Sequence, residues 1–156
     1  MTAFTGNNGG ASFTPAAHAT NANNLTLHAD TAGDVGKVIQ IGWGGRGTTS
    51  TGYRTRWGRA TTNGVTPTSL NPLASNPSAT PLCSINTYGT APILGADPIA
   101  LFAIDWNLVG GGGAIVLPLA AGWYVVSTAA PYAQIACGNI TGSDAGLSSY
   151  STVWEE

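Results

Sequence analysis

Charged side chains are scarce in this sequence. Lys and Arg number five and Asp and Glu seven, which is 8% of the 156 residues, against about 25% in an ordinary soluble domain. Hydroxyl and amide side chains, together with 22 glycines, must therefore form most of the surface. With a formal net charge of -2, such a surface provides little repulsion between copies, which favours self-association.

Groups suited to catalysis or metal binding are also few. The histidines are His18 and His28, and Asp30 follows His28 by two residues. A Ser-His-Asp site usually places its serine on a strained turn with a recognisable motif, and the sequence has no such motif. HxxxH, CxxC and EF-hand spacings are absent as well. We therefore predict no catalytic residue, no metal site and no cofactor.

Long hydrophobic runs and export signals are missing too. The apolar stretches PIALFAI and AIVLPLAAGWYVV are too short or too interrupted to span a bilayer, and no basic segment precedes an apolar run at Met1. We expect a soluble protein with no membrane partner. Cys83 and Cys137 have no metal-like spacing. Without an export signal, two buried reduced thiols are favoured over one disulfide.

The segments that remain have strand character. They are rich in β-branched and aromatic residues and are bounded by Gly, Pro, Asn or Asp, whereas Glu and Lys, which favour helices, are rare. This pattern predicts an all-β fold, a jelly-roll-like antiparallel β-sandwich of about eight strands, in preference to an immunoglobulin-like topology. The segments are KVIQIGW, YRTRWGRA, LCSINTYG, PIALFAIDW, AIVLPL, WYVVSTA, YAQIACG and SYSTVW.

Two segments are expected to lie outside these strands. Residues 1–32 contain few large apolar side chains and no steady period, so they predict an extended N-terminal arm in which only NNLTLHA could form a strand. The sandwich domain would then span residues 33–156. Residues 61–81 carry four prolines among Asn, Ser and Thr, which predicts a long ordered loop.

One strand has a helical alternative, and the glycine runs need an interpretation. Within residues 96–107, Asp97 and Pro98 suit the first turn of a short helix. The runs GWGGRG and VGGGGA lack a phosphate-binding motif, so both predict turns. The second run also suits a hairpin connection or a close approach of another backbone.

All five cations fall between positions 37 and 59, interleaved with aromatic residues. If YRTRWGRA is a strand, Tyr53, Thr55 and Trp57 face the core and Arg54 and Arg56 face the other way. The five cations are Lys37, Arg46, Arg54, Arg56 and Arg59.

Three interpretations of this basic stretch compete. Mixed cations and aromatics suit single-stranded nucleic acid. The isoelectric point near 5.5 and the lack of a second basic stripe argue against that partner. A solvated strand face needs no partner at all. Arg and aromatic residues are favoured at protein interfaces, where Lys is depleted. We therefore predict a protein-partner interface at Arg46, Arg54, Arg56 and Arg59.

The run GWGGRGTTSTGYRTRWGRATT, the later LFAIDWN and the C-terminal STVWEE resemble small structural proteins encoded among phage head genes. The most similar type is the jelly-roll capsid decoration, or cement, protein, and the resemblance covers roughly residues 36–156. It implies a homotrimer on the outer surface of a phage head, assembled in the host cytoplasm, with the major capsid protein or another virion protein as partner. It also implies that there is no cofactor and no catalytic residue.

Two other functions remain open from the sequence. A head fibre, collar or tail protein would have the same β-rich composition and fold. A carbohydrate-binding adhesin would use exposed tryptophans as stacking surfaces, although tryptophan in a sandwich ordinarily packs the core. The tryptophans considered for stacking are Trp43, Trp57, Trp106 and Trp123.

Overall fold

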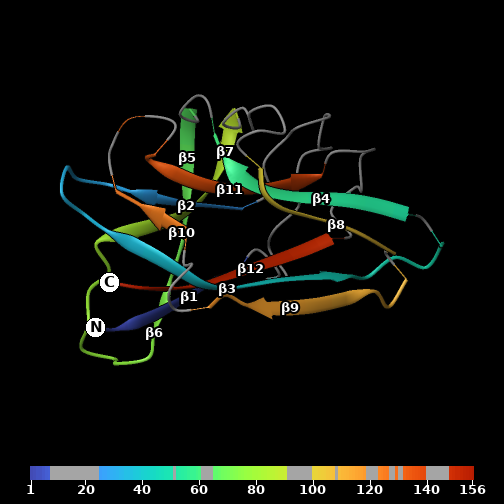
Figure 1. Cartoon of the computed structure of the whole chain (residues 1–156), viewed down its shortest axis with the longest axis horizontal. Helices are drawn as coiled ribbons and strands as arrows, with labels where there is room; N and C mark the ends of the chain where they lie inside the picture. Colours follow the sequence, from blue (N-terminus) through green and yellow to red (C-terminus); the bar gives the residue numbers. More distant parts are fainter. Residues whose placement is uncertain are drawn as a thin grey trace.

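The chain folds as two antiparallel sheets of six strands each, packed face to face, and the described residues contain no helix (Figure 1). This confirms the predicted all-β sandwich, with twelve strands in place of about eight. The computed structural model describes residues 1–7, 25–50, 52–60, 65–90, 100–107, 109–118, 123–126, 129, 132–139 and 148–156.

Sheet A is built around β3. Its strand order is β10-β3-β12-β1-β6, and β9 also pairs with β3, on the side where β10 pairs with it. The strands of sheet A are β1 (Ala3–Asn7), β3 (Gly36–Gly45), β6 (Leu73–Ala74), β9 (Gly112–Val116), β10 (Trp123–Val125) and β12 (Ser148–Glu155).

Sheet B has the order β5-β7-β2-β11-β4-β8. Its strands are β2 (Leu25–Ala29), β4 (Gly52–Arg59), β5 (Val65–Leu70), β7 (Cys83–Thr90), β8 (Ala100–Asn107) and β11 (Gln134–Asn139). The chain changes sheet at most of its connections, as between β1 and β2, β2 and β3, and β11 and β12. Such crossing is typical of a jelly-roll-like sandwich and differs from a meander.

The core lies between the two sheets and is rich in aromatic side chains. Trp57 and Trp154 are 1% and 0% exposed, and Phe4 stacks on Trp154 with ring centroids 5.7 Å apart. Burying a side chain of this size stabilises the fold by about 1.5–3 kcal/mol. The other fully buried large side chains are Tyr150, Leu25, Leu27, Ile41, Ile85, Gln134, Val38 and Val125.

The N-terminal segment is not an extended arm where the structure describes it. β1 lies between β12 and β6, and β2 lies within sheet B between β7 and β11. Phe4 and Leu27 are 2% and 1% exposed. Each strand has only five residues, which is too short for a clear apolar period. The possible strand in NNLTLHA is confirmed from Leu25 onward. Residues 8–24 lie outside the described part.

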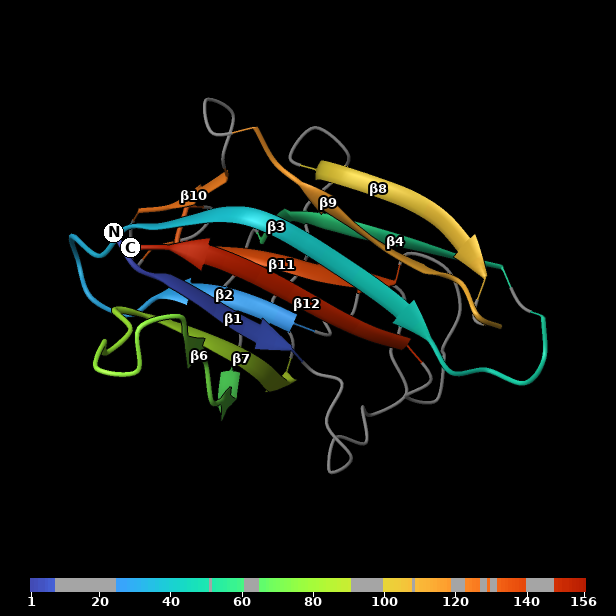
Figure 2. The same cartoon turned by 90° about the horizontal axis from the view of Figure 1, so that it is seen from below.

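The two ends of the chain lie side by side (Figure 2). The main-chain nitrogen of Thr2 donates to the oxygen of Glu156, and the nitrogen of Glu156 donates to the oxygen of Thr2, each over 3.1 Å. β1 and β12 pair over their whole shared length, from Ala3 opposite Glu155 to Asn7 opposite Ser151. The first residues of the chain therefore hold its last ones in place.

The proline-rich segment was predicted to be a loop, and this is wrong for β5 and β6. Both strands are the outermost members of their sheets. An edge strand leaves one side of its backbone unpaired, so a proline there costs little. Pro67, opposite Tyr88, shows this in β5. Asn76 and Pro77 do lie in a turn, in which the side-chain oxygen of Asn76 accepts from the main-chain nitrogen of Ser78 and its main-chain oxygen accepts from that of Ala79. Residues 61–64 are outside the described part.

The helical alternative is wrong for residues 100–107, which form β8. β8 pairs with β4 along its length. The paired residues lie more than forty positions apart in the sequence, so local helix signals cannot reveal this pairing. Residues 96–99 lie outside the description.

The glycine runs form strand as well as turn, which corrects the prediction of a turn for the first run. The close approach of another backbone is confirmed for the second run, where a Cβ on Gly112 would stand 2.9 Å from the main-chain oxygen of Trp43. Gly42, Gly44 and Gly45 lie within β3. Gly113 lies in β9, where an added Cβ would stand 2.9 Å from the ring of Trp43. Gly110, at φ 63°, provides the turn before β9. These glycines therefore leave room for Trp43 as well as for the turn.

Candidate functional site

Strand β4 carries the basic residues of interest, and its core face is as predicted. Thr55 and Trp57 are 0% and 1% exposed. The ring of Trp57 packs edge-on against Trp43 and Tyr150 of sheet A, with centroids 5.9 Å apart in both pairs. These two β4 side chains are therefore part of the core. The side chain of Tyr53 lies outside the described part.

Arg54 lies on the outer face of sheet B, where it meets an acid. It is opposite Asp105 of β8, and its Nε lies 3.7 Å from Asp105 Oδ1. The side chains are 55% and 75% exposed, so water screens the pair and it contributes about 0–1 kcal/mol. Arg54 can therefore exchange this acid for a carboxylate of another protein at little cost.

Arg56 also lies on the outer face by alternation, but it is only 5% exposed. Its neighbours across the sheet are Ala103 of β8 and Gly138 of β11, both of them small residues. A guanidinium buried to this extent does not suit a residue that a partner must reach.

Arg59 bridges the two sheets. It pairs with the core residue Ile135 of β11, and its Nη1 donates to the main-chain oxygen of Tyr124 in β10 over 2.8 Å. Its guanidinium lies 5.2 Å from the ring centroid of Tyr132. Burial lowers the pKa of Arg59, and Tyr132 partly opposes this shift. These contacts indicate a structural role for Arg59.

Arg46 is exposed in the connection from β3 to β4. This connection enters β4 at the end that holds Arg54, whereas Arg59 lies at the other end of the strand (Figure 2). Five residues of strand separate Arg54 from Arg59 by about 16 Å. The structure therefore does not gather the four arginines of the predicted interface. Arg46 and Arg54 are the accessible pair.

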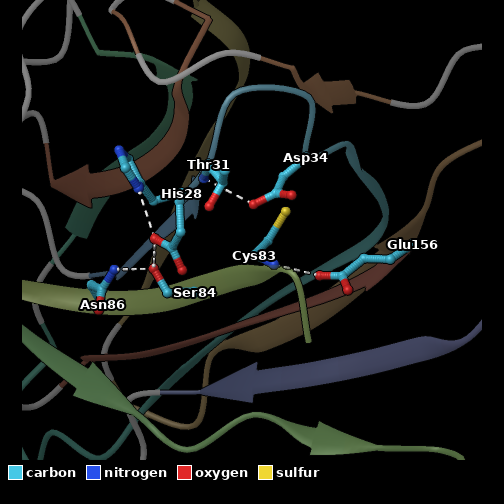
Figure 3. Close-up of polar contacts among 8 residues, drawn as sticks. His28, Thr31, Asp34, Cys83, Ser84, Asn86 and Glu156 are labelled. Atoms are coloured by element: carbon cyan, nitrogen blue, oxygen red, sulfur yellow. Dashed lines mark hydrogen bonds and ion pairs between the residues drawn. The ribbon is translucent and has the colours of Figure 1, made fainter. Parts of the chain in front are cut away.

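A second polar cluster includes His28 of β2 and Ser84 and Asn86 of β7 (Figure 3), and it centres on Asp30. Ser84 Oγ donates to Asp30 Oδ1 over 2.7 Å, and His28 Nδ1 lies 3.1 Å from the same oxygen. Asn86 Nδ2 donates to Ser84 Oγ over 2.6 Å. In a hydrolytic triad the histidine stands between serine and acid, but here the acid stands in the middle. His28 therefore makes no contact through which it could take the Ser84 proton. His18 lies outside the described residues.

The carboxylate of Glu156 holds the start of β7 (Figure 3). Its Oε2 accepts from the main-chain nitrogen of Leu82 over 2.6 Å, and its Oε1 accepts from that of Cys83 over 2.8 Å. Trp154 Nε1 also donates to Oε1, over 2.8 Å. No local sequence signal reveals this contact, because the two main-chain partners lie 74 and 73 residues away.

Cys83 and Cys137 are free and buried, as favoured from the sequence. They lie on opposite sides of β2, facing Ala29 and Leu25. Four residues of strand separate these positions by about 13 Å, whereas a disulfide needs Cα atoms within about 7 Å. Burial raises the pKa of both thiols, and the nearby Glu156 carboxylate raises that of Cys83 further. Neither is a reactive thiolate.

The rest of the described surface has a hollow but few side chains suited to metal binding or catalysis. A hollow of ≈350 Å³ lies on sheet A and is lined mainly by small residues of β3, β9 and β12, such as Gly42, Ala114 and Ser151. Within the described ranges, no three His, Cys, Asp or Glu side chains are placed to hold a metal ion. The same ranges contain no helix of the length and apolarity that crossing a membrane requires.

No family model, curated protein or solved structure matches this chain.

Proposed function

We propose that this chain is a non-catalytic structural protein of a virus particle, specifically a capsid decoration protein that binds the outer surface of a phage head and stabilises it. One observation carries the proposal: large apolar side chains are exposed on a sandwich with very few charges. Val116, Leu73 and Tyr132 are 72%, 67% and 54% exposed. Apolar side chains exposed among so few charges favour contact with neighbouring proteins. The resemblance of residues 36–156 to cement proteins supports the same role.

Arg46 and Arg54 are the residues that we assign to the capsid contact. Both are exposed near one end of the sandwich, and water screens the pair of Arg54 with Asp105. A carboxylate of the major capsid protein that excludes water from Arg54 would form a stronger, charge-assisted hydrogen bond than Asp105 does.

The absence of catalysis is part of the proposal and has two supports. The Asp30 cluster places its acid where a triad needs a histidine. The thiols of Cys83 and Cys137 are buried with raised pKa values, so neither supplies a nucleophile at neutral pH. A decoration protein needs neither an acid-base pair nor a cofactor.

The carbohydrate-binding alternative depends on exposed tryptophan rings, and this support for it is weak. Trp57 is buried, and Trp43, Trp106 and Trp123 pack against the core cluster, so these rings are engaged in packing. A head fibre, collar or tail protein is the remaining alternative, because the same sandwich would serve each of them.

The location of the chain in a purified particle tests the proposal. We expect many copies on the outer head surface, and saturable binding when the protein is added to heads that lack it. Heads with bound protein should resist heat better than bare heads. Absence from the particle, or a location confined to the tail or a fibre, would overturn the proposal.

A variant pair tests the assigned contact. The double variant Arg46→Ala, Arg54→Ala should bind heads at least about thirtyfold more weakly, because even one lost charged contact at a desolvated interface costs about 2 kcal/mol or more. The matched control is Thr48→Ala, Thr49→Ala, which changes two exposed residues of the same connection. Equal binding by both double variants would remove the arginines from the interface.

Self-association is also proposed. The resemblance implies a homotrimer, which sedimentation equilibrium would detect as three copies of the 15.7 kDa chain. The virion is the proposed location of the assembled protein.

A further inference from the structure

Strand β9 is an exposed edge of sheet A (Figure 1). Among the described strands it pairs only with β3, and four of its five residues are exposed. The sequence from residue 106 to residue 143 contains no Asp, Glu, Lys or Arg. Natural sheet edges are commonly blocked by charged side chains, by proline within the strand or by a covering segment. β9 has no charge and no proline of its own, so it is open to pairing.

The backbone of β9 presents its free groups in a regular pattern. Leu117 donates its main-chain N–H to the oxygen of Ile39 in β3 over 2.8 Å. Hydrogen-bonded and non-hydrogen-bonded pairs alternate along an antiparallel ladder. The odd-numbered residues of β9 therefore bond to β3, and the N–H and C=O groups of Gly112, Ala114 and Val116 point away from it.

These three residues form a self-complementary edge. If a second copy runs antiparallel about a two-fold axis at Ala114, Ala114 stands opposite its own counterpart and Gly112 stands opposite Val116. Val116, which is 72% exposed, would then cover a glycine, where no Cβ competes for space. The three residue pairs would exchange about six main-chain hydrogen bonds.

We propose that two copies of this chain pair edge to edge through β9, antiparallel about a two-fold axis at Ala114. The inference rests on the self-association proposed above and names a surface for it. The contact is isologous and joins copies in pairs, so it is separate from the three-fold contact that a trimer uses. It would join the A sheets of two protomers into one continuous sheet and bury both Val116 side chains.

A cross-linking experiment tests the register. In a hydrogen-bonded antiparallel pair the opposed Cα atoms are about 5.5 Å apart, which lies within the range that a disulfide spans. Mild oxidation of Ala114→Cys should therefore give a covalent dimer on a non-reducing gel. The native thiols do not interfere, because Cys83 and Cys137 are buried. The control is Ala103→Cys, exposed on β8 at the edge of sheet B, which should give far less dimer.

A charge placed on the edge tests the energetics. Val116→Lys should raise the dissociation constant for self-association at least about tenfold, because it replaces apolar burial with a charge that blocks edges. Ser75→Lys is the matched control, since Ser75 is exposed directly after β6, at the opposite edge of the same sheet. Its association should match that of the unaltered chain.

Three outcomes would overturn the pairing. They are a chain that stays monomeric at micromolar concentration, an Ala114→Cys variant that cross-links no better than Ala103→Cys, and equal effects of the two lysine substitutions. None of these outcomes bears on whether the chain lies on the head surface. Failure of the pairing and failure of the decoration role are therefore distinguishable.

Discussion

Arg59 and Tyr124 tie the two sheets together at one end of the sandwich. Arg59 Nη1 in β4 donates to the main-chain oxygen of Tyr124 in β10 over 2.8 Å, and the ring of Tyr132 lies 5.2 Å from the guanidinium. β4 belongs to sheet B and β10 to sheet A. A residue that the sequence suggested for a partner surface therefore supports the fold.

Replacing Arg59 should destabilise the protein. Arg59→Met keeps much of the apolar stem and removes the hydrogen bond and the contact with Tyr132, so the free energy of unfolding should fall by about 1–3 kcal/mol. Urea unfolding measures this change. The control is Arg46→Met, at an exposed position, which should change stability by less than about 0.5 kcal/mol. Equal stability of the two variants would contradict the inter-sheet role.

Arg54 and Arg56 should differ in stability although they share one face of β4. Arg54→Ala removes an exposed pair and should cost about 0–1 kcal/mol of folding free energy. Arg56 is 5% exposed, so Arg56→Ala removes the packing of a buried side chain and should cost about 1–3 kcal/mol. Thermal or urea unfolding of both variants measures the difference. Indistinguishable stability would show that the burial of Arg56 contributes nothing.

The alternation of β4 was predictable because it depends on neighbouring residues only. Thr55 and Trp57 face the core for the reason that the sequence gives, a period of two. The role of Arg59 was not predictable, because its partner Tyr124 lies 65 residues away on the other sheet. The hydrogen bond that the Glu156 carboxylate accepts from the main-chain nitrogen of Cys83 was not predictable for the same reason, because the two residues lie 73 positions apart.

The strands that the sequence did not reveal have a shared physical cause. β1 has five residues and β6 has two, so their apolar residues are too few to form a period. Their partners supply the stabilisation, since β1 pairs with both β12 and β6. Pairing of this kind is non-local, and proline excludes a segment from the middle of a sheet only, not from its edge.

The buried thiols predict a loss of stability at alkaline pH. In the folded state burial raises the pKa of Cys83 and Cys137, whereas in the unfolded chain each thiol ionises at a pKa of about 8.5. Above that pH the folded state binds more protons than the unfolded state, so stability falls as pH rises. It is fully present below the unfolded pKa, and each thiol can cost up to about 1.4 kcal/mol per pH unit above it.

Urea unfolding between pH 7 and about pH 9.5 measures this slope before tyrosine and lysine ionise in the unfolded chain. Cys137→Ala should be less stable at pH 7, because a buried group is removed, and should show a shallower decline with pH. A slope unchanged by this substitution would mean that Cys137 does not contribute to the pH dependence.

Phe4 should be essential to the fold, although it is the fourth residue of the chain. It is 2% exposed and stacks on Trp154, with an interplanar angle of 21°. Phe4→Ala should lower the free energy of unfolding by about 3–5 kcal/mol, because it leaves a cavity against Trp154. That loss is a large share of the 5–15 kcal/mol typical of a whole domain. Guanidinium unfolding measures the change.

Thr5→Ala is the matched control on the same strand. Thr5 faces away from the core between Val153 and Leu73, so its loss should cost less than about 1 kcal/mol. If Phe4→Ala and Thr5→Ala were equally stable, β1 would not contribute to the core. Deleting residues 1–7 should cost more than Phe4→Ala, because it also removes the pairing of β12 and β6 with β1 and the hydrogen bonds between Thr2 and Glu156. If the truncated chain unfolded at the same denaturant concentration as the intact one, residues 1–7 would not stabilise the sandwich. The prediction of an N-terminal arm would then hold for them.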